Sequence, residues 1–247
     1  SSDELIDVAN LTLSKLYVCA RDNGLNINTE KTKAIIFRPK NKSVIIMRDI
    51  VLNSVPIEIV STFKTLGVLF SERMSWDKHI DHLAAKLSRV IGLTYRHGSS
   101  LPVNVKLLIY NALFQSHLNY CSLVWSNTTF TNLQKLYLLQ KRILRIICNV
   151  PYDYHSEGLF RKFRMLKIFN LYDYRLCISL KLESKKNTRF LSGLSELVPN
   201  DHVYLTRHME YWKVTACKTN YGTQTLRYTI PKLLNYLARN EICIDSI

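Results

Sequence analysis

The spacing of apolar residues changes at Trp76, and this change constrains the fold more than any other feature of the sequence. Before it, apolar residues form one helical segment and then short runs of strand length. After it, they recur every three or four residues over long segments, which is the pattern of amphipathic helices. With 247 residues, 47% of them hydrophobic, the chain is long enough for one large domain or two small ones.

Residues 2–22 are predicted to form a helix that ends at Gly24. Its apolar stripe comprises Ile6, Ala9, Leu13, Leu16, Tyr17 and Ala20. Strands are expected at 34–37, in SVIIM (43–47), and on both sides of a hairpin turn at Asn53-Ser54. The run TLGVLF is interpreted as a strand in which Gly67 permits another backbone or a ligand to approach closely, with a bulge or packing against a helix as the alternative.

Three helices are expected after Trp76. The first has Ser75 as its N-cap, the second covers 103–120, and the third starts with a capping box at 131–134. The second is apolar on nearly all sides, which favours a central position. Short connections between the three predict an antiparallel bundle. Beyond it, 156–186 is helix-like and basic, 219–231 reads as a loop with a short strand, and an amphipathic segment lies near 231–240.

Positive charge is unevenly distributed along the chain, whose formal net charge is +15. Residues 1–76 carry ten Lys or Arg and eight Asp or Glu, whereas residues 77–150 carry nine and two. Several cations fall on the predicted outer faces of the first and third helices: Lys78, Lys86, Arg89, Lys135, Arg142 and Arg145. Clustered cations favour nucleic acid as the partner, and an anionic membrane surface second. The alternative is a solvated face with no partner.

The six cysteines lack metal-site spacing and are interpreted as reduced core residues of an intracellular protein, nuclear or cytoplasmic. No apolar run approaches the length of a membrane span. The chain has no Gly-rich phosphate loop, no metalloprotease motif and no Asp-Asp pair. Two histidines, His79 and His82, lie one turn apart near acidic residues, but a solvated helix face explains them better than a metal site, and no metal ligands are assigned.

Four blocks of the sequence carry a resemblance to a known family. They are GLNINTEKTKAIIF (24–37), FKTLGVLFSERMSWDKHI (63–80), YNALFQSHLNYCSLVW (110–125) and LQKLYLLQKRILRII (133–147). Together, in this order and spacing, they resemble the C-terminal part of reverse transcriptases from non-LTR, LINE-like retrotransposons. Two later blocks, at 166–176 and 219–237, resemble the tail that follows in some of these elements.

The resemblance implies an α+β fold with three parts. Residues 1–76 would be a partial polymerase palm with one helix and short antiparallel strands, 77–150 a thumb-like three-helix bundle, and 151–247 a helical C-terminal extension. Lys31 would be a candidate general acid that protonates pyrophosphate, because it falls in the family's Asn-x-x-Lys-Thr block. The Leu66-Gly67-Val68 block would resemble the primer grip, and the cations of the two helices would hold the template–primer duplex by its backbone.

The family's Tyr-x-Asp-Asp strand, its fingers and its upstream palm strands are not found in the sequence. The full-length family uses Mg²⁺, and this chain is expected to hold no cofactor. The chain is therefore interpreted as a fragment of an RNA-directed DNA polymerase that is inactive alone, with an RNA–DNA hybrid or DNA duplex and the missing palm and fingers as its partners. The alternatives are a stand-alone nucleic-acid-binding helical module and, less favoured, a protein-interaction domain with an incidental charge excess.

Overall fold

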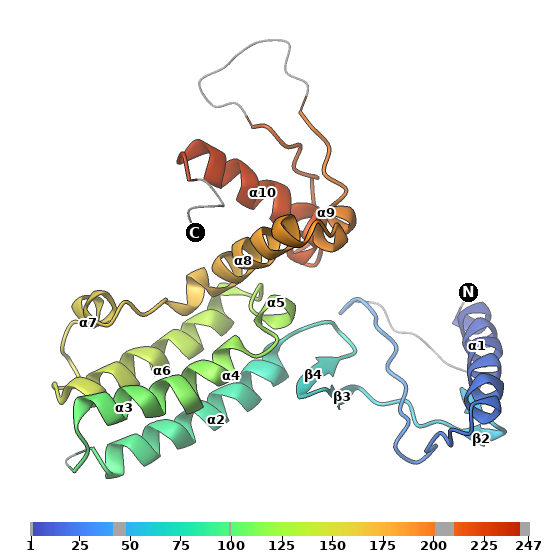
Figure 1. Cartoon of the computed structure of the whole chain (residues 1–247). Helices are drawn as coiled ribbons and strands as arrows, with labels where there is room; N and C mark the ends of the chain where they lie inside the picture. Colours follow the sequence, from blue (N-terminus) through green and yellow to red (C-terminus); the bar gives the residue numbers. More distant parts are fainter. Residues whose placement is uncertain (1, 42–47, 99, 201–209, 243–247) are drawn as a thin grey trace. The chain divides into compact units, whose positions relative to one another are not determined.

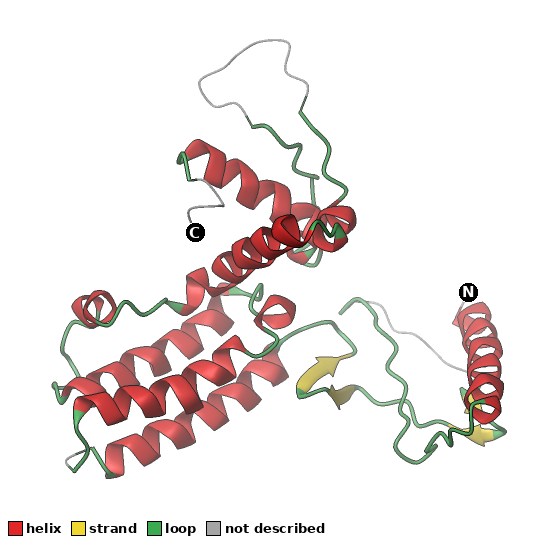
Figure 2. Cartoon of the chain, viewed as in Figure 1, coloured by secondary structure: helices red, strands yellow, loops and turns green. Residues whose placement is uncertain are grey.

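The computed structural model describes residues 2–41, 48–98, 100–200 and 210–242. It is mostly helical with two small antiparallel sheets (Figure 2). The chain divides into two compact units, an N-terminal unit (Ser1–His79) and a C-terminal unit (Ile80–Ile247). The α+β class is confirmed by these elements. The three boundaries expected from the sequence stay predictions.

The N-terminal unit begins with helix α1 (Ser2–Asp22), as predicted. One side of α1 packs on a small apolar core that contains Ile6, Ile50, Leu52 and Ile57, with Leu13 and Tyr17 against it. Two side chains anchor this packing: Asn10 accepts a hydrogen bond from the Val51 N–H (2.9 Å) through Oδ1, and Asp7 pairs with Arg48 (2.8 Å). The expected inward position of Leu16 is wrong, because its side chain is exposed.

A second apolar face of α1 lies open among the described residues. Leu5 is 59% exposed, Val8 64% and Leu11 57%. At 3.6 residues per turn, these residues lie on the side of the helix opposite the Ile6 stripe. Helix α1 is thus apolar on two faces and buries only one of them.

Two hairpins supply the strands of this unit. β1 (Val51–Leu52) pairs with β2 (Val55–Pro56) across Asn53 and Ser54, whose φ angles of 50° and 64° confirm the predicted turn. β3 (Thr62–Thr65) pairs with β4 (Val68–Ser71). The strand expected at 34–37 is wrong: only an isolated bridge joins Ala34 to Ile59 there. The strand expected at 43–47 lies outside the described residues.

The C-terminal unit contains the three helices expected after Trp76, apart from the first three residues of α2 (Figure 1). They are α2 (Asp77–Arg96), a second helix made of α3 (Val103–Ile109), the π-helical η1 (Tyr110–Gln115) and α4 (Ser116–Asn119), and α6 (Phe130–Cys148). Their facing sides form a core of fully buried apolar side chains, including Ile80, Leu87, Phe114, Leu118, Leu136, Ile143 and Ile147. The second helix is less central than expected, because Leu108 is 67% exposed and Leu113 41%.

The two ends of α6 are stabilised differently. The capping box at 131–134 is wrong: α6 starts at Phe130 after Thr129, and no side chain caps it. Its C-terminal end is held by Lys106 of α3, which is fully buried although lysine is rarely so. Lys106 Nζ donates to Asn149 Oδ1 (2.7 Å) and contacts the Ile146 carbonyl (3.5 Å), so the ammonium satisfies acceptors at the negative end of the helix dipole.

The remaining chain folds into shorter helices. α5 (Ser122–Trp125) precedes α6, and α7 (Glu157–Lys162), η2 (Ile168–Asn170), α8 (Leu171–Lys186), α9 (Phe190–Ser195), η3 (Gly222–Gln224) and α10 (Leu226–Arg239) follow it. α8 and α10 share a core of six buried residues: Tyr172, Leu176, Cys177, Ile230, Leu233 and Leu237. The short strand expected within 219–231 is wrong, because α10 begins at Leu226. Of the five described cysteines, all free, only Cys177 is buried, so the core interpretation holds for that one.

Candidate nucleic-acid interface

The Leu66-Gly67-Val68 block forms the tip of the β3–β4 hairpin. Leu66 and Gly67 are its two-residue turn, with φ angles of 45° and 81°, and the register pairs Thr65 with Val68. The interpretation of Gly67 as the middle of a strand is therefore wrong. Glycine suits this position because both turn residues need positive φ, which costs a residue with a Cβ about 1–2 kcal/mol. Leu66 is 85% exposed, whereas Val68 is buried.

Aromatic rings hold this hairpin to the first turn of α2. Phe70 of β4 makes an edge contact with Trp76 (5.6 Å between ring centroids), and Trp76 makes one with His79 (6.2 Å). The buried His79 accepts a hydrogen bond from the Leu69 N–H through Nδ1 (3.3 Å). His79 is therefore a structural link between strand and helix, in a position that sequence reasoning assigned to a solvated face.

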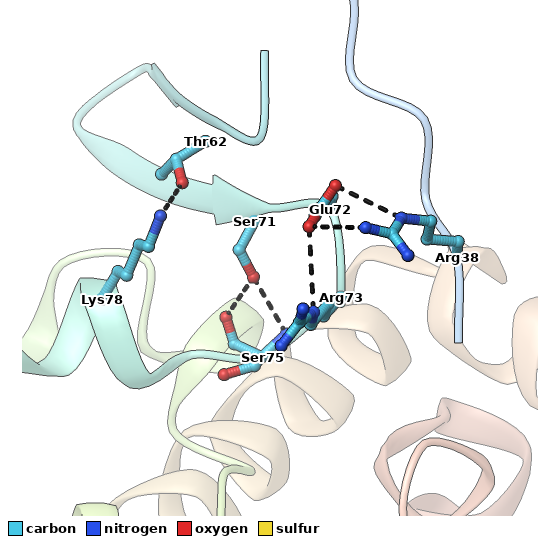
Figure 3. A network of polar contacts seen from close by, with 7 residues as sticks. All are labelled: Arg38, Thr62, Ser71, Glu72, Arg73, Ser75 and Lys78. Atoms are coloured by element: carbon cyan, nitrogen blue, oxygen red, sulfur yellow. Dashed lines mark hydrogen bonds and ion pairs between the residues drawn. The ribbon is translucent and has the colours of Figure 1, made fainter. Parts of the chain in front are cut away.

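A polar network completes the junction (Figure 3). Ser71 Oγ donates to the Ser75 carbonyl (2.8 Å) and accepts from the Ser75 N–H (3.1 Å). Ser75 Oγ accepts from the backbone N–H of Asp77 (3.2 Å), the first residue of α2, although Ser75 lies two residues before the helix begins. Lys78 Nζ donates to Thr62 Oγ1 of β3, so the first of the predicted phosphate-binding cations is exposed but fixed against the hairpin.

A second contact ties residue 38 to the end of the same hairpin. The guanidinium of Arg38 binds Glu72 through both carboxylate oxygens (3.1 and 3.3 Å), and its backbone N–H donates to the Glu72 carbonyl (2.8 Å). These bonds, drawn in part in Figure 3, fix the segment that follows the Asn-x-x-Lys-Thr block. A bidentate pair of this kind also specifies orientation.

The Asn-x-x-Lys-Thr block itself is a tight turn. Asn28 Oδ1 accepts from the Lys31 N–H (3.0 Å), and Thr32 Oγ1 donates to the Asn28 carbonyl (2.7 Å). The side chains of Asn28 and Thr32 therefore stabilise the turn. From the sequence pattern alone, the same two residues could equally well have been assigned to catalysis. Lys31 is exposed on this turn.

In the C-terminal unit, Lys86 and Arg89 of α2 differ in their exposure. Arg89 is exposed, and Lys86 is half-buried close to His117 of α4. Burial and, second, the charge of Lys86 lower the pKa of His117 below its ordinary value of 6.5. Arg96 lies on the same side of the helix, two turns beyond Arg89. It was not predicted, although its seven-residue spacing from Arg89 was the one signal that could have indicated it.

The three predicted cations of α6 differ in their surroundings. Lys135 pairs with Asp81 of α2 (2.8 Å), which joins the N-terminal halves of α6 and α2. Arg142 lies two turns along α6 from Lys135 and is exposed. Arg145 donates to the Tyr154 carbonyl through Nε (2.9 Å) and lies over the Tyr152 ring (5.5 Å), so part of its hydrogen-bonding capacity is used by the segment after α6.

A cavity of about 500 Å³ in the same unit was not anticipated from the sequence. Its lining residues come from three segments around 126–133, 169–173 and 223–236. No sequence signal could have found it, because the segments meet only through tertiary packing.

The side chains of the described part of the chain do not form a metal site. There, no three His, Cys, Asp or Glu side chains lie close enough together to hold an ion. The described residues therefore do not provide the ligand set of a Mg²⁺ site. None of the described helices combines the length and apolarity that a membrane crossing requires.

Comparison with known proteins finds a distant relative. No family model and no solved structure match the chain. A protein of Drosophila melanogaster described as a probable RNA-directed DNA polymerase from transposon X-element is 21% identical over 154 residues. The match covers 61% of this chain but only 17% of that protein. The chain is therefore distantly related to the reverse transcriptases of non-LTR retrotransposons.

Proposed function

We propose that this chain is the duplex-holding part of a retrotransposon reverse transcriptase. In this proposal α1 and the two hairpins are the end of the palm, α2, α3–α4 and α6 are the thumb, and the remaining helices are a C-terminal extension. The chain contacts template–primer duplex through phosphate groups and performs no polymerisation alone.

The observation that carries the proposal is the arrangement of cations on α2. Arg89 and Arg96 are exposed on one side of α2, and the apolar stripe on its other side is buried. From Arg89 to Arg96 the helix rises about 10 Å, which corresponds to roughly three nucleotides of one duplex strand at about 3.4 Å each. Two exposed cations at that spacing suit contacts to phosphates of one strand.

Phosphate contact without base readout is what a polymerase thumb needs. A polymerase holds duplexes of any sequence, and phosphate contacts carry no direct sequence information. Arg142 on α6 extends the charged surface beside α2, because Asp81 and Lys135 hold the two helices together. Few acidic side chains lie among these cations, because Asp77 and Asp81 are the only Asp or Glu residues between positions 77 and 150.

In this proposal the hairpin tip and Lys31 act only in the complete polymerase. Leu66 and Gly67 would contact the primer end, since the tip is exposed and its turn brings bare backbone to the surface. Lys31 would donate a proton to the leaving pyrophosphate in the complete active site, where it would also offset developing negative charge.

The catalytic carboxylates would come from upstream palm and fingers supplied as a partner. The open apolar face of α1, with Leu5, Val8 and Leu11, supports this partner, because a face of that kind is suited to cover by further palm structure. The expected result of a primer-extension assay with Mg²⁺ and all four dNTPs is no product from this chain alone. Extension by the purified chain would contradict the assignment.

Duplex binding is tested by fluorescence anisotropy with a labelled 20-base-pair RNA–DNA hybrid over a series of salt concentrations. The double variant Lys86→Ala/Arg89→Ala is expected to bind more weakly. The slope of log K against log salt is expected to fall by about 0.9 for each phosphate that the variant no longer neutralises. The matched control is Lys185→Ala/Lys186→Ala, which removes two charges from the last turn of α8.

If both double variants reduce affinity and slope equally, the binding is delocalised charge attraction and the α2 assignment is wrong. If the hybrid is not bound even at low salt, the whole proposal is wrong. A stand-alone binding module is distinguished from a polymerase fragment by adding an upstream palm and fingers polypeptide: only the fragment regains Mg²⁺-dependent extension.

A further inference from the structure

The cavity of about 500 Å³ in the C-terminal unit is a built site that lies apart from the cations of the proposed duplex grip. Its walls are the loop 126–128 before α6, η2 with the first turn of α8, and η3 with α10. This volume falls in the range of about 300–1,000 Å³ that is typical of ligand sites. None of the cations assigned to the duplex lines it.

Aromatic rings line this cavity and are held from behind. Phe169 is stacked on Phe130 (5.3 Å, 14° between ring planes) and contacts Tyr137 (5.0 Å), so its ring is fixed on one side. Across from the start of α8, α10 contributes Tyr228 and Tyr236. Tyr236 is 59% exposed, and its ring is open to contact from a ligand.

Polar groups of both signs accompany the rings. Asp173 and Lys232 line the cavity together, and Lys232 Nζ lies 5.5 Å from the centre of the Tyr228 ring. Partial desolvation raises the pKa of Asp173, and the charge of Lys232 acts in the opposite direction. Asn127 Nδ2 donates to the Thr223 carbonyl (3.4 Å), which joins the loop before α6 to η3 and orients the amide oxygen.

The deeper part of the site is structurally fixed. Tyr172 and Thr229 share a hydrogen bond between their hydroxyl groups (3.0 Å), and both are buried. Thr128 Oγ1 accepts from Asn132 Nδ2 of α6 (3.0 Å). Three segments distant in the sequence are therefore locked together around the cavity, so its shape is set before any ligand enters.

One ligand class matches this combination of groups. A nucleobase is flat, stacks on aromatic side chains with its faces and forms hydrogen bonds with its polar edge, and single-stranded nucleic acids are recognised in this way. A cation at the rim suits the phosphate attached to that base. A plain anion would be repelled by Asp173, and a wholly apolar ligand would cover Asp173 and Lys232 without offering them hydrogen-bond partners.

We propose that this cavity binds one unpaired nucleotide of a single-stranded nucleic acid, with the base between Phe169 and Tyr236 and its phosphate near Lys232. Asp173 is a hydrogen-bond acceptor, so it favours bases that carry an amino group, such as guanine, over uracil. This site is separate from the duplex-binding cations. It rests on the proposed function only for the source of the single strand, which would be the template or the primer.

The first experiment uses the full chain and fluorescence-labelled octaribonucleotides, either all uridine or uridine with one central guanosine. Tyr236→Ala is expected to weaken binding of the guanosine octamer about ten-fold, within the range for removal of one base–aromatic stack. Tyr236→Phe keeps the ring and is expected to restore binding. Tyr174→Ala is the matched control, because Tyr174 is also exposed and lies on α8 but does not line the cavity.

The second experiment separates recognition of the base from attraction of the phosphate. Asp173→Asn is expected to remove the preference for guanosine over uridine. Lys232→Ala is expected to weaken both octamers equally and to lower the salt slope by about 0.7, the value for one single-strand phosphate contact. Thermal unfolding of each variant confirms that the fold is retained.

The outcomes distinguish this proposal from the duplex grip. If Tyr236→Ala and Tyr174→Ala bind the octamers like the unmodified chain, while Lys86→Ala/Arg89→Ala weakens hybrid binding, the cavity proposal is overturned and the duplex grip stands. If Tyr236→Ala weakens octamer binding and leaves hybrid binding unchanged, the cavity is supported as a separate site. The cavity proposal is also overturned if Tyr236→Ala, Tyr236→Phe and Tyr174→Ala all weaken octamer binding to the same extent.

Discussion

Helices α1 and α2 have nearly the same length, 21 and 20 residues, but they bury their apolar residues to different extents. α2 buries one apolar stripe completely and exposes cations on its other side. α1 buries Ile6 but leaves Leu5, Val8 and Leu11 exposed. The comparison indicates that α2 buries its main apolar stripe within the C-terminal unit, whereas α1 has a second apolar face suited to a further partner.

The largest expected effect tests this difference directly. Leu87→Ala in α2 removes a fully buried side chain and is expected to lower the free energy of unfolding of the C-terminal unit by about 2–5 kcal/mol. Leu11→Ala in α1 is the counterpart on an exposed face and is expected to change stability by no more than about 0.5 kcal/mol. Urea unfolding followed by circular dichroism measures both. A destabilisation by Leu11→Ala as large as that by Leu87→Ala would remove the distinction between the helices.

The next effect concerns the buried lysine at the end of α6. Lys106→Met keeps most of the packing but removes the charged donor to Asn149, and is expected to cost about 1.5–3 kcal/mol, the usual net contribution of a hydrogen bond to a charged group. Lys106→Ala also opens a cavity and is expected to cost more. The same urea experiment compares them. Unchanged stability in both variants would show that the ammonium does not support the bundle.

A smaller effect on stability is expected from replacing glycine by alanine, and its sign differs between the two units. Gly67→Ala places a Cβ at a φ of 81° in the β3–β4 turn and is expected to cost about 1–2 kcal/mol. Gly92→Ala, in α2 with open space around the added carbon, is expected to stabilise by about 0.5–1 kcal/mol. Thermal unfolding of the two variants compares them. A gain for Gly67→Ala would contradict the hairpin turn.

The smallest effect reports on the surface around Lys86. The pKa of His117 lies below its ordinary value, first through burial and second through Lys86, so stability is lost as the pH falls below the value in the unfolded chain. Lys86→Ala is expected to raise the His117 pKa without restoring the ordinary value, and to make stability less sensitive to acid. A histidine NMR titration measures the change, with Arg142→Ala as the control that leaves it unaltered.

The same titration locates the duplex. Bound phosphates close to Lys86 are expected to raise the pKa of His117, because negative charge favours the protonated imidazole. If a saturating RNA–DNA hybrid leaves the pKa unchanged, the nucleic acid lies elsewhere on the C-terminal unit.

Local patterns predicted much of the helical structure. The periodicity of apolar residues located α1, α2 and α6, and the inward positions of Leu136, Ile143 and Ile147 are confirmed. The short strands were predicted less well: residues 34–37 form only one bridge, and the Leu66-Gly67 pair is a turn. Strand pairing depends on partners many residues away, so a short apolar run does not specify it.

The candidate site divides in the same way. The outward positions of Arg89 and Arg142 follow from helical spacing and agree with the structure. The pairing of Lys135 with Asp81, the engagement of Arg145 by Tyr154 and the capping role of Lys106 could not be predicted, because each joins residues brought together by packing.

The sequence by itself determined where the long helices lie and which of their sides carries positive charge, because one turn of a helix repeats within four residues. Tertiary structure alone decided that a second apolar face of α1 stays exposed, that a lysine is buried at the end of α6, and that three distant segments enclose a cavity beside Tyr236. Those features depend on contacts between residues tens of positions apart, whose geometry is fixed only when the whole unit packs.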